Sequence, residues 1–272
     1  MQGRLSPVID GRIQAFPWPS WQEEFAIAER LGVRLIEWTL DQDRLYENPL
    51  LTVAGQSEIG VARREHGIDI PSLTGDCFMQ APFWKVRGEE SERRRRDFRA
   101  VAEACVDVRI SMVVVPLVDN GRIENLGQEQ ALADSLEDLS PLLRSRGLRV
   151  LFESDFGPAE LARFISTFDP DLFGINYDIG NSAAAGFDPA EEIEAYGHRI
   201  LSVHVKDRVL GGSTVPLGSG NADFEAVFAA LGRVRYVGNY ILQTARATDG
   251  DHAGVVSIYR NMTSEWVTYH GT

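Results

Sequence analysis

Three polar residues that interrupt apolar runs are the best candidates for chemistry in this sequence. Glu153 ends the run LRVLFE, Asp178 ends FGINYD, and His204 lies inside ILSVHVKD. A carboxylate that is half buried without a partner is costly. A divalent cation would suit two carboxylates and an imidazole together. An ion pair or a hydrogen bond would explain any one of these residues singly, so it is the set of three that favours a metal site.

The elements that must position these residues alternate along the chain between β-rich runs and amphipathic helical segments. The runs expected as strands are VRLIEWTL (33–40), IDIPSL (68–73), SMVVVPL (111–117), LRVLFES (148–154), FGINYD (173–178), ILSVHVK (200–206) and YVGNYIL (236–242), with residues 1–5 as a short eighth. This repetition predicts an α/β fold, a single (β/α)8 TIM barrel forming one domain over residues 1–272. A doubly wound open sheet is the alternative, but no GxGxxG or P-loop follows the first strand.

Helix boundaries carry their own signals. Ser20 with Glu23 predicts a capping box at the start of a helix, because each side chain can accept from the other's backbone N–H. Gly147 is expected just after a helix end, and Pro158 suits a first turn.

Composition limits the class of protein. A chain of 272 residues with 44% apolar side chains can bury one sizeable core. Its formal charge of −13 repels phosphate backbones and anionic lipids, so neither nucleic acid nor membrane is an expected partner. The two cysteines lack metal-site spacing, no cationic and apolar leader opens the chain, and no apolar run reaches ~18 residues. A cytoplasmic location is expected.

In a barrel of this kind the chemistry lies at the carboxyl ends of the strands. Gln243 ends the last apolar run, NYILQ, and is therefore a fourth candidate beside the first three residues. Several polar and aromatic residues near the same ends are candidates for binding the substrate: Glu37, Trp38, Asp76, Asn181, Lys206, Arg208 and Arg246. The cations among them could hold the hydroxyls or phosphate of a substrate.

The motifs NYDIGNS, SVHVKDR and VPLGSGNADF follow one another between residues 176 and 224. In this order they resemble the xylose isomerase-like TIM barrels, which include sugar and sugar-phosphate isomerases and epimerases, and are most similar to the L-ribulose/L-xylulose 5-phosphate 3-epimerases. The resemblance implies a metal site with one ligand from each of four strands. Three of these ligands fall on Glu153, Asp178 and His204. The fourth, a glutamate in the family, falls on Gln243, whose amide oxygen can face a cation without bringing charge.

This departure at Gln243 bears on the reaction. The epimerase mechanism implied by the resemblance removes a proton beside a carbonyl and returns one to the opposite face, using the first and fourth ligands. Glutamine cannot take a proton. A two-base epimerisation would need a substitute such as Glu37 or Asp76, whereas an aldose-ketose isomerisation can run with Glu153 alone. A core amide satisfied by the backbone is the other interpretation of Gln243.

The predicted function is a divalent-metal-dependent isomerase or epimerase of a small sugar or sugar phosphate, with Glu153 as the base. Two alternatives remain open: a metal-dependent lyase or dehydratase acting on a keto-polyol, and a sugar-binding barrel that has lost turnover. Mn²⁺ is the first expected cofactor for this donor set, ahead of Mg²⁺, Zn²⁺ and Co²⁺. A homo-oligomer is compatible with the resemblance.

Overall fold

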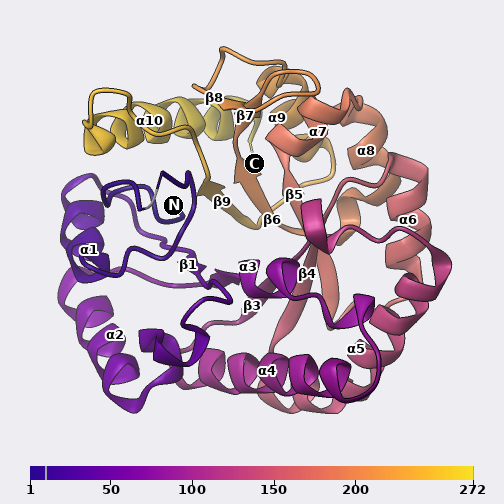
Figure 1. Ribbon diagram of the computed structural model, residues 1–272. Helices are drawn as coiled ribbons and strands as arrows, with labels where there is room; N and C mark the ends of the chain where they lie inside the picture. The colour runs from indigo at the N-terminus through magenta and orange to yellow at the C-terminus, as the bar shows by residue number, and fades with distance from the viewer. Residues whose placement is uncertain (10, 272) are drawn as a thin grey trace.

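The computed structural model describes residues 1–9 and 11–271. Its centre is a parallel sheet of seven strands that lie side by side in the order in which they occur along the chain. The strands are β1 (Trp38–Thr39), β2 (Ser72–Thr74), β3 (Met112–Leu117), β4 (Arg149–Ser154), β5 (Phe173–Asp178), β6 (Ile200–Val205) and β9 (Asn239–Leu242). Figure 1 shows this sheet at the centre of a ring of helices. The predicted α/β fold, a TIM barrel, is confirmed.

The N-terminal segment closes the barrel. Gln2 donates its backbone N–H to the carbonyl of Leu242 at 3.1 Å, and Glu37 donates to the carbonyl of Met1 at 2.8 Å. Met1 and Gln2 therefore lie between β9 and the chain leading into β1, in the position of an eighth strand. The predicted eighth strand over residues 1–5 is reduced to a single parallel bridge between Gln2 and Glu37.

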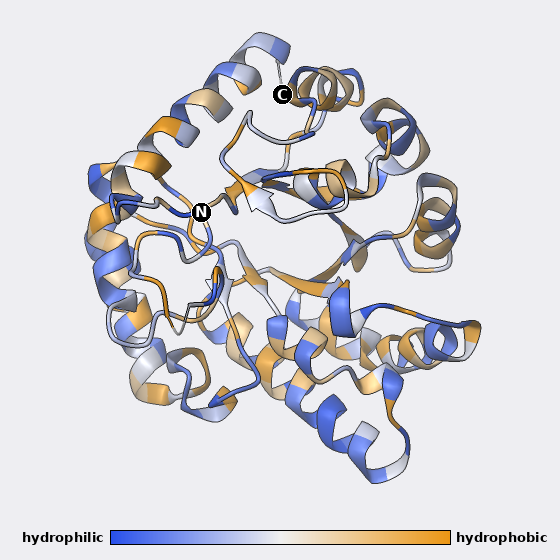
Figure 2. Cartoon of the chain, turned by 45° about the horizontal axis from the view of Figure 1, so that its top comes forward, coloured by the Kyte–Doolittle hydropathy of each residue, from blue (hydrophilic) through white to orange (hydrophobic). Residues whose placement is uncertain are grey.

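The helices surround the sheet with their apolar faces turned inward and their polar faces outward, as the orange and blue faces in Figure 2 show. They are α1 (Trp21–Arg30), α2 (Val53–His66), α3 (Asp76–Gln80), α4 (Gly88–Asp107), α5 (Leu126–Arg146), α6 (Pro158–Ser166), α7 (Ile179–Ala185), α8 (Pro189–Tyr196), α9 (Phe224–Arg233) and α10 (His252–His270). Short 3-10 helices cover Leu45–Glu47, Pro49–Leu51, Phe83–Lys85, Asp119–Gly121 and Gly197–Arg199. Among the described residues, no helix is long and apolar enough to cross a membrane.

The helix punctuation was mostly predicted correctly. Gly147 ends α5 with a φ of 63°, a conformation that favours glycine, and Pro158 is the first residue of α6. Ser20 does precede α1, but its side chain makes no capping hydrogen bond. The capping-box prediction is therefore wrong: Glu23 donates its N–H to the backbone carbonyl of Ser20 at 3.0 Å instead.

Strand alternation decides which residues face the barrel interior. Phe152 on β4 packs outward, with its ring 5.1 Å from that of Phe164 on α6. Leu151 belongs to a small separate cluster with Met112 and Val114 of β3, which fills the inside of the barrel. Because side chains two positions apart share a face, Glu153 follows Leu151 into the interior at the carboxyl end of β4.

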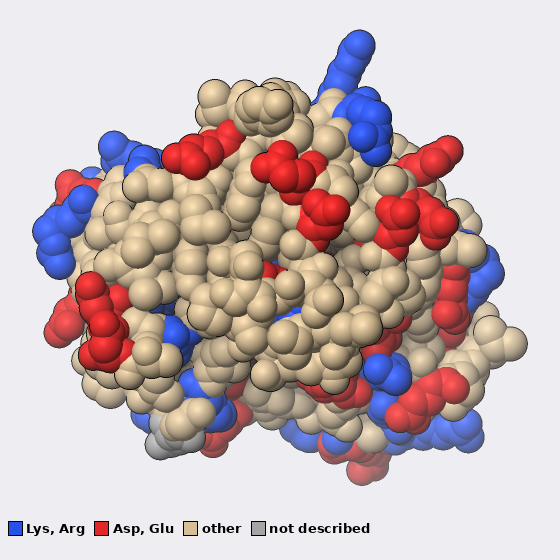
Figure 3. Space-filling view, turned by 90° about the horizontal axis from the view of Figure 1, so that it is seen from above, with Lys and Arg blue, Asp and Glu red and all other residues tan. Residues whose placement is uncertain are grey.

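Surface charge is mixed on the face that carries the helices at the top of Figure 1. Figure 3 shows acidic and basic side chains interspersed around a broad uncharged area on this face, without a basic patch. The many acidic side chains on this face agree with the net charge of −13.

Arg246 anchors the N-terminal loop against the barrel. Its guanidinium donates to three backbone carbonyls, those of Gly3 at 2.7 Å, Ser6 at 2.6 Å and Ile13 at 3.0 Å. From the other side, the buried carboxylate of Glu24 accepts from the backbone N–H groups of Leu5 and Ser6 at 3.1 and 2.8 Å. A cation and an anion thus replace the backbone pairing that a regular first strand would supply.

Replacing Arg246 by alanine should loosen this loop. Three carbonyls would lose a charged donor, so we expect the free energy of unfolding to fall by about 1.5–3 kcal/mol. Urea denaturation followed by circular dichroism measures the change. Arg99→Ala, on the exposed face of α4, is the control and should be nearly neutral. Equal stability of both variants and wild type would contradict an anchoring role.

Candidate active site

Glu153, Asp178 and His204 come together at the carboxyl ends of three adjacent strands, β4, β5 and β6. One ligand atom from each lies within 4.8 Å of the others, and all three residues are buried. The Nδ1 atom of His204 is 3.2 Å from Glu153 Oε2 and 3.9 Å from Asp178 Oδ2. Asp178 and His204 are direct neighbours in the register of β5 and β6. The three residues predicted to form a metal site are thus brought to one point.

Glu37 holds the other side of the His204 ring. Its Oε1 atom lies 2.8 Å from His204 Nε2, and its carboxylate also accepts hydrogen bonds from Ser72 Oγ and Thr74 Oγ1. Burial acts to lower the pKa of His204, but the charge of Glu37 and the site carboxylates raise it well above the usual value. Burial likewise acts to raise the pKa of Glu37, and His204 with the two hydroxyls lowers it. The two side chains therefore form a buried charge pair.

The Nδ1 atom of His204 is suited to a metal ion. It is buried and, despite the nearby carboxylates, makes no hydrogen bond of acceptable geometry. With Nε2 held by Glu37, the lone pair of a neutral ring would lie on Nδ1 and face Glu153 and Asp178. A carboxylate behind a metal-binding histidine orients the ring and raises its basicity. The donor set of two carboxylates and one imidazole fits a divalent cation.

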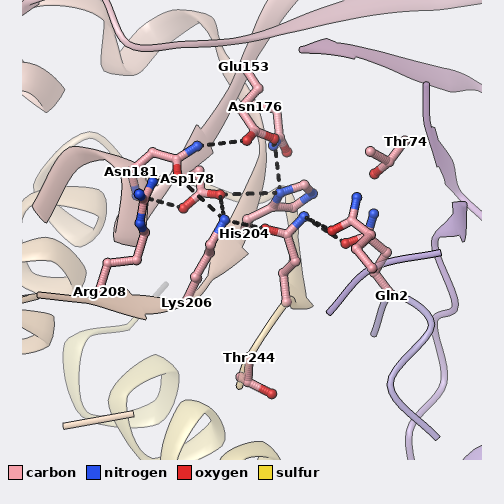
Figure 4. Close-up of polar contacts among 12 residues, drawn as sticks. Gln2, Thr74, Glu153, Asn176, Asp178, Asn181, His204, Lys206, Arg208 and Thr244 are labelled. Carbon is pink, nitrogen blue, oxygen red and sulfur yellow. Dashed lines mark hydrogen bonds and ion pairs between the residues drawn. The ribbon is translucent and has the colours of Figure 1, made fainter. Parts of the chain in front are cut away.

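The motif DIGN builds the middle of the site. Asp178 caps α7 through Oδ1, which accepts from the backbone N–H of Asn181 at 2.9 Å. Its Oδ2 accepts from Lys206 Nζ at 3.1 Å, and this ammonium holds the pKa of Asp178 low although burial acts to raise it. A Cβ atom on Gly180 would lie 2.6 Å from Lys206 Cγ, so glycine is needed for the lysine to pass. Figure 4 shows Glu153, Asp178, Asn181 and Lys206 converging beside His204.

Gln243 takes part in the same polar network. Its Oε1 accepts from Lys206 Nζ at 2.9 Å, and its Nε2 donates to Gln2 Oε1 at 2.7 Å and to Gln14 Oε1 at 3.1 Å. All these partners are side chains, unlike those of a core amide satisfied by the backbone. A metal-ligand role for Gln243 stays a prediction, because its oxygen here faces the lysine.

A cavity of about 710 Å³ reaches the site at Glu153. Of the predicted site residues, those that line it are Asp76, Glu153, Asn181, Lys206, Arg208 and Gln243. The cavity lining, as far as the described residues form it, does not include Glu37, Trp38, Asp178, His204 or Arg246. Trp38 is buried and donates from Nε1 to Asn48 Oδ1 at 3.0 Å. The structure places Glu37 behind His204 and Arg246 under the N-terminal loop, so no contact supports their predicted role in substrate binding.

Asn181 and Arg208 face the cavity but are already engaged. Asn181 Nδ2 donates to Glu153 Oε1 at 2.8 Å, and its Oδ1 accepts from Arg208 Nη1 at 2.7 Å. Arg208 also donates through Nη2 to the carbonyl of Gly212 at 2.7 Å. Their observed contacts orient Glu153 and the loop above it.

The motif VPLGSGNADF lies behind the cavity wall and is not part of the predicted metal site. The buried carboxylate of Asp207 accepts backbone N–H groups from Gly218, Gly220 and Ala222 at 2.9, 2.8 and 3.1 Å. A Cβ atom on Gly220 would lie 2.2 Å from Asp207 Oδ1, so this glycine is required. The loop supports the hairpin of β7 (Asp207–Arg208) and β8 (Thr214–Val215), which contributes to the cavity wall.

Sequence reasoning missed several residues of the cavity. Gln14, Arg122, Asp155 and Ser213 line it from loops, and Thr214 lines it from β8. None of them ends an apolar run, so strand-end reasoning gave no signal for them. The strand ends did indicate Asp76 and Gln243, but not Gln14, the loop residue that hydrogen-bonds to both.

Residues 25–258 match the sequence profile described as the xylose isomerase-like TIM barrel. The chain belongs to this family. Over 262 residues it is 25% identical to the L-ribulose-5-phosphate 3-epimerase UlaE of Escherichia coli O1:K1 / APEC, a match that covers 91% of this chain and 88% of that protein. Over 147 residues it is 28% identical to the inosose dehydratase of Clostridium botulinum (strain Alaska E43 / Type E3), covering 45% of this chain. The chain spans only 49% of that relative's length in this match.

Among solved structures, the chain resembles the IOLI protein with a bound zinc atom. The TM-score is 0.76 at 19% identity, over 92% of this chain and 94% of that one. At this identity the likeness shows the fold. The predicted family is confirmed, and the enzyme names of the relatives confirm the prediction of an enzyme family.

Zinc binding should displace a proton from His204. A metal ion needs the neutral ring, and the charge of Glu37 and the site carboxylates hold the pKa of His204 well above its usual value, so metal binding competes with protonation of the ring. We expect about one proton released per ion at about pH 7, and an affinity that rises from about pH 6 to about pH 8. Calorimetry in buffers of different ionisation enthalpy measures both quantities.

His204→Ala should bind zinc more than about 100-fold more weakly than wild type. His270→Ala is the matched control, because this histidine lies at the end of α10 and contacts only the surface carboxylate of Glu225 among the described ion pairs. Equal zinc affinity in His204→Ala and wild type would exclude the predicted metal site.

Proposed function

We propose that this chain, acting as one barrel domain over residues 1–272, is a divalent-metal-dependent isomerase or epimerase of a small keto sugar or its phosphate. The observation that carries the proposal is the buried meeting of Glu153 and Asp178 at His204 Nδ1, an atom that makes no hydrogen bond, beside a polar cavity that Glu153 lines. The name of the epimerase relative supports the same class. A cavity of about 710 Å³ is large enough for a monosaccharide or its phosphate.

Glu153, Asp178 and His204 would hold the ion, with Gln243 as a proposed fourth ligand. When bound, the ion supplies Lewis acidity that stabilises negative charge on the oxygens of a hydroxyketone. Mn²⁺ is our first candidate, because the set mixes carboxylate and imidazole donors, and Zn²⁺, Mg²⁺ and Co²⁺ follow. The zinc atom named for a structural neighbour belongs to that protein and is consistent with a divalent site here.

Glu153 is the proposed base. It lines the cavity, and two amides fix its carboxylate: Asn176 Nδ2 donates to Oε2 at 3.1 Å and Asn181 Nδ2 to Oε1 at 2.8 Å. A base held in place by hydrogen bonds meets the proton beside a carbonyl without reorganisation. The role of Asn181 is then to orient Glu153, and Lys206 orients Asp178 and Gln243.

A metal-dependent lyase or dehydratase on a keto-polyol is the second candidate. The observation that favours it is the 28% identity to an inosose dehydratase. The same proton abstraction beside a carbonyl by Glu153 would begin this reaction, and loss of a β-hydroxyl would complete it. Product analysis with an inosose and with ketoses separates the two candidates.

Glu153→Gln should abolish turnover and leave the fold intact. Losing a general base costs about 10²–10⁴ in rate, and any disturbance of the metal adds to this. Turnover is followed by NMR with L-ribulose, L-ribulose 5-phosphate and an inosose, and zinc affinity by calorimetry. Glu160→Gln, exposed on α6, is the control. Activity of Glu153→Gln within a few-fold of wild type would place the base elsewhere.

Gln243→Glu should bind the metal more tightly, because one more negative charge would face the site. We expect at least about a tenfold gain, equivalent to about 1.4 kcal/mol. The variant would lose the N–H groups of position 243 that donate to Gln2 and Gln14. The side-chain amides of these two glutamines can turn and donate to the new carboxylate instead. Gln243→Ala should weaken binding. If calorimetry gives one affinity for the three proteins, Gln243 has no part in the metal site.

A further inference from the structure

We infer that Asp76 is the second proton-transfer residue of this site, acting on the substrate from the side of the cavity that faces the metal residues. This inference rests on the proposed function. It assigns to Asp76 the task that the fourth carboxylate has in the implied epimerase mechanism, and that Gln243 cannot perform because an amide does not take up a proton at neutral pH.

The other carboxylates near the cavity are unsuited to the task. Glu37 is fully inaccessible and committed to His204. Asp119 lines the cavity but is exposed at its rim. Asp155 is partly exposed and forms an ion pair with Arg122. Asp76, like Glu153, is both buried and part of the cavity lining.

The topology places Asp76 across the barrel mouth from His204. It follows β2, whereas Glu153, Asp178 and His204 lie on β4, β5 and β6. In a ring that the N-terminal segment completes as the eighth position, β2 stands across from β6. Glu153 on β4 is separated from β2 by β3, so Glu153 and Asp76 approach a sugar in the cavity from two different directions.

Asp76 is equipped to exchange a proton at neutral pH. Burial raises its pKa to about 7, against a hydrogen bond from Gln14 Nε2 that acts to lower it. The nearby carboxylates of Asp41, Glu153 and Glu37 raise it further. The charge of Asp76 acts to raise the pKa of Arg4, a buried cation. Arg4 donates its hydrogen bonds to backbone carbonyls. A general acid or base is most effective when its pKa lies close to the working pH.

Gln14 links Asp76 to the substituted ligand. Its Oε1 accepts from Gln243 Nε2 at 3.1 Å, and its Nε2 donates to Asp76 Oδ2. Since Gln243 donates, the amide of Gln14 can turn only one way, with its N–H groups toward Asp76. The glutamine that replaces the fourth carboxylate thus fixes, through Gln14, the position of the carboxyl group that takes over its task.

The step is balanced as a proton exchange. Glu153 removes the proton from the carbon beside the carbonyl, and the electron pair of the C–H bond moves toward the carbonyl oxygen. The carboxyl group of Asp76 gives its proton to the opposite face of the same carbon, and a new C–H bond forms. The product is the epimer, Glu153 is left protonated and Asp76 ionised, and both return to their starting states by exchange with water. No oxidant or reductant takes part.

The test uses the metal-loaded protein in deuterated water with L-ribulose, L-ribulose 5-phosphate and an inosose. Asp76→Asn should keep deuterium exchange into the starting sugar within about tenfold of wild type, because Glu153 can still remove and return a proton on its own face. Epimer formation should fall by about 10²–10⁴. Glu153→Gln should lose both signals, and Asp107→Asn, at the exposed end of α4, should lose neither.

A second experiment measures the pKa of Asp76 directly, without substrate. The carboxyl ¹³C signal of Asp76 in the zinc-loaded protein, assigned by its absence in Asp76→Asn, should titrate near neutral pH. Titration at the ordinary value of about 4, or epimer formation by Asp76→Asn at the wild-type rate, would overturn the inference alone. A wild-type protein that neither exchanges deuterium nor forms product with any of the three compounds would overturn the proposed function, and the inference with it.

Discussion

The buried charge pair of Glu37 and His204 is the interaction on which the site depends. Neither side chain reaches water, and each moves the pKa of the other toward the charged form. Removing one partner would leave a buried charge uncompensated, which is far more costly than losing a surface ion pair. The pair also fixes the ring of His204 so that Nδ1 faces Glu153 and Asp178. The position of the proposed metal ligands therefore depends on a contact that has no proposed part in the chemistry.

The closure of the barrel positions this pair. Glu37 lies where the chain enters β1, and its backbone N–H is held by the carbonyl of Met1. Gln2, the next residue, faces Gln243 across the mouth of the barrel at 2.7 Å. The N-terminal segment is itself held by Arg246 and Glu24 rather than by a regular strand. Two backbone hydrogen bonds, the half-buried side chain of Arg246 and the buried side chain of Glu24 thus hold the start of the chain in the barrel.

Much of this fold could be predicted from the sequence because its strands are apolar and short. The predicted strand over residues 173–178 agrees with the structure at both ends, and those over 111–117 and 148–154 differ by one residue. The first strand was predicted over 33–40 but covers only Trp38–Thr39, because Leu35 pairs as an isolated bridge. Strand ends also indicated Glu153, Asp178 and His204. The strand-end pattern could not reveal that Glu37 lies behind His204. A residue at the end of a strand can face either the cavity or a buried neighbour such as the His204 ring.

Charge balance explains why a glutamine at position 243 suits this site. Glu37, Glu153 and Asp178 bring three negative charges, and the ammonium of Lys206 lies against Asp178 and Gln243. With His204 neutral and a divalent ion bound, these charges would cancel. A fourth carboxylate would leave a net negative charge in a buried region, and an ionised Asp76 nearby would add another. An amide at position 243 and a carboxyl group at Asp76 that can stay protonated keep the site close to neutral.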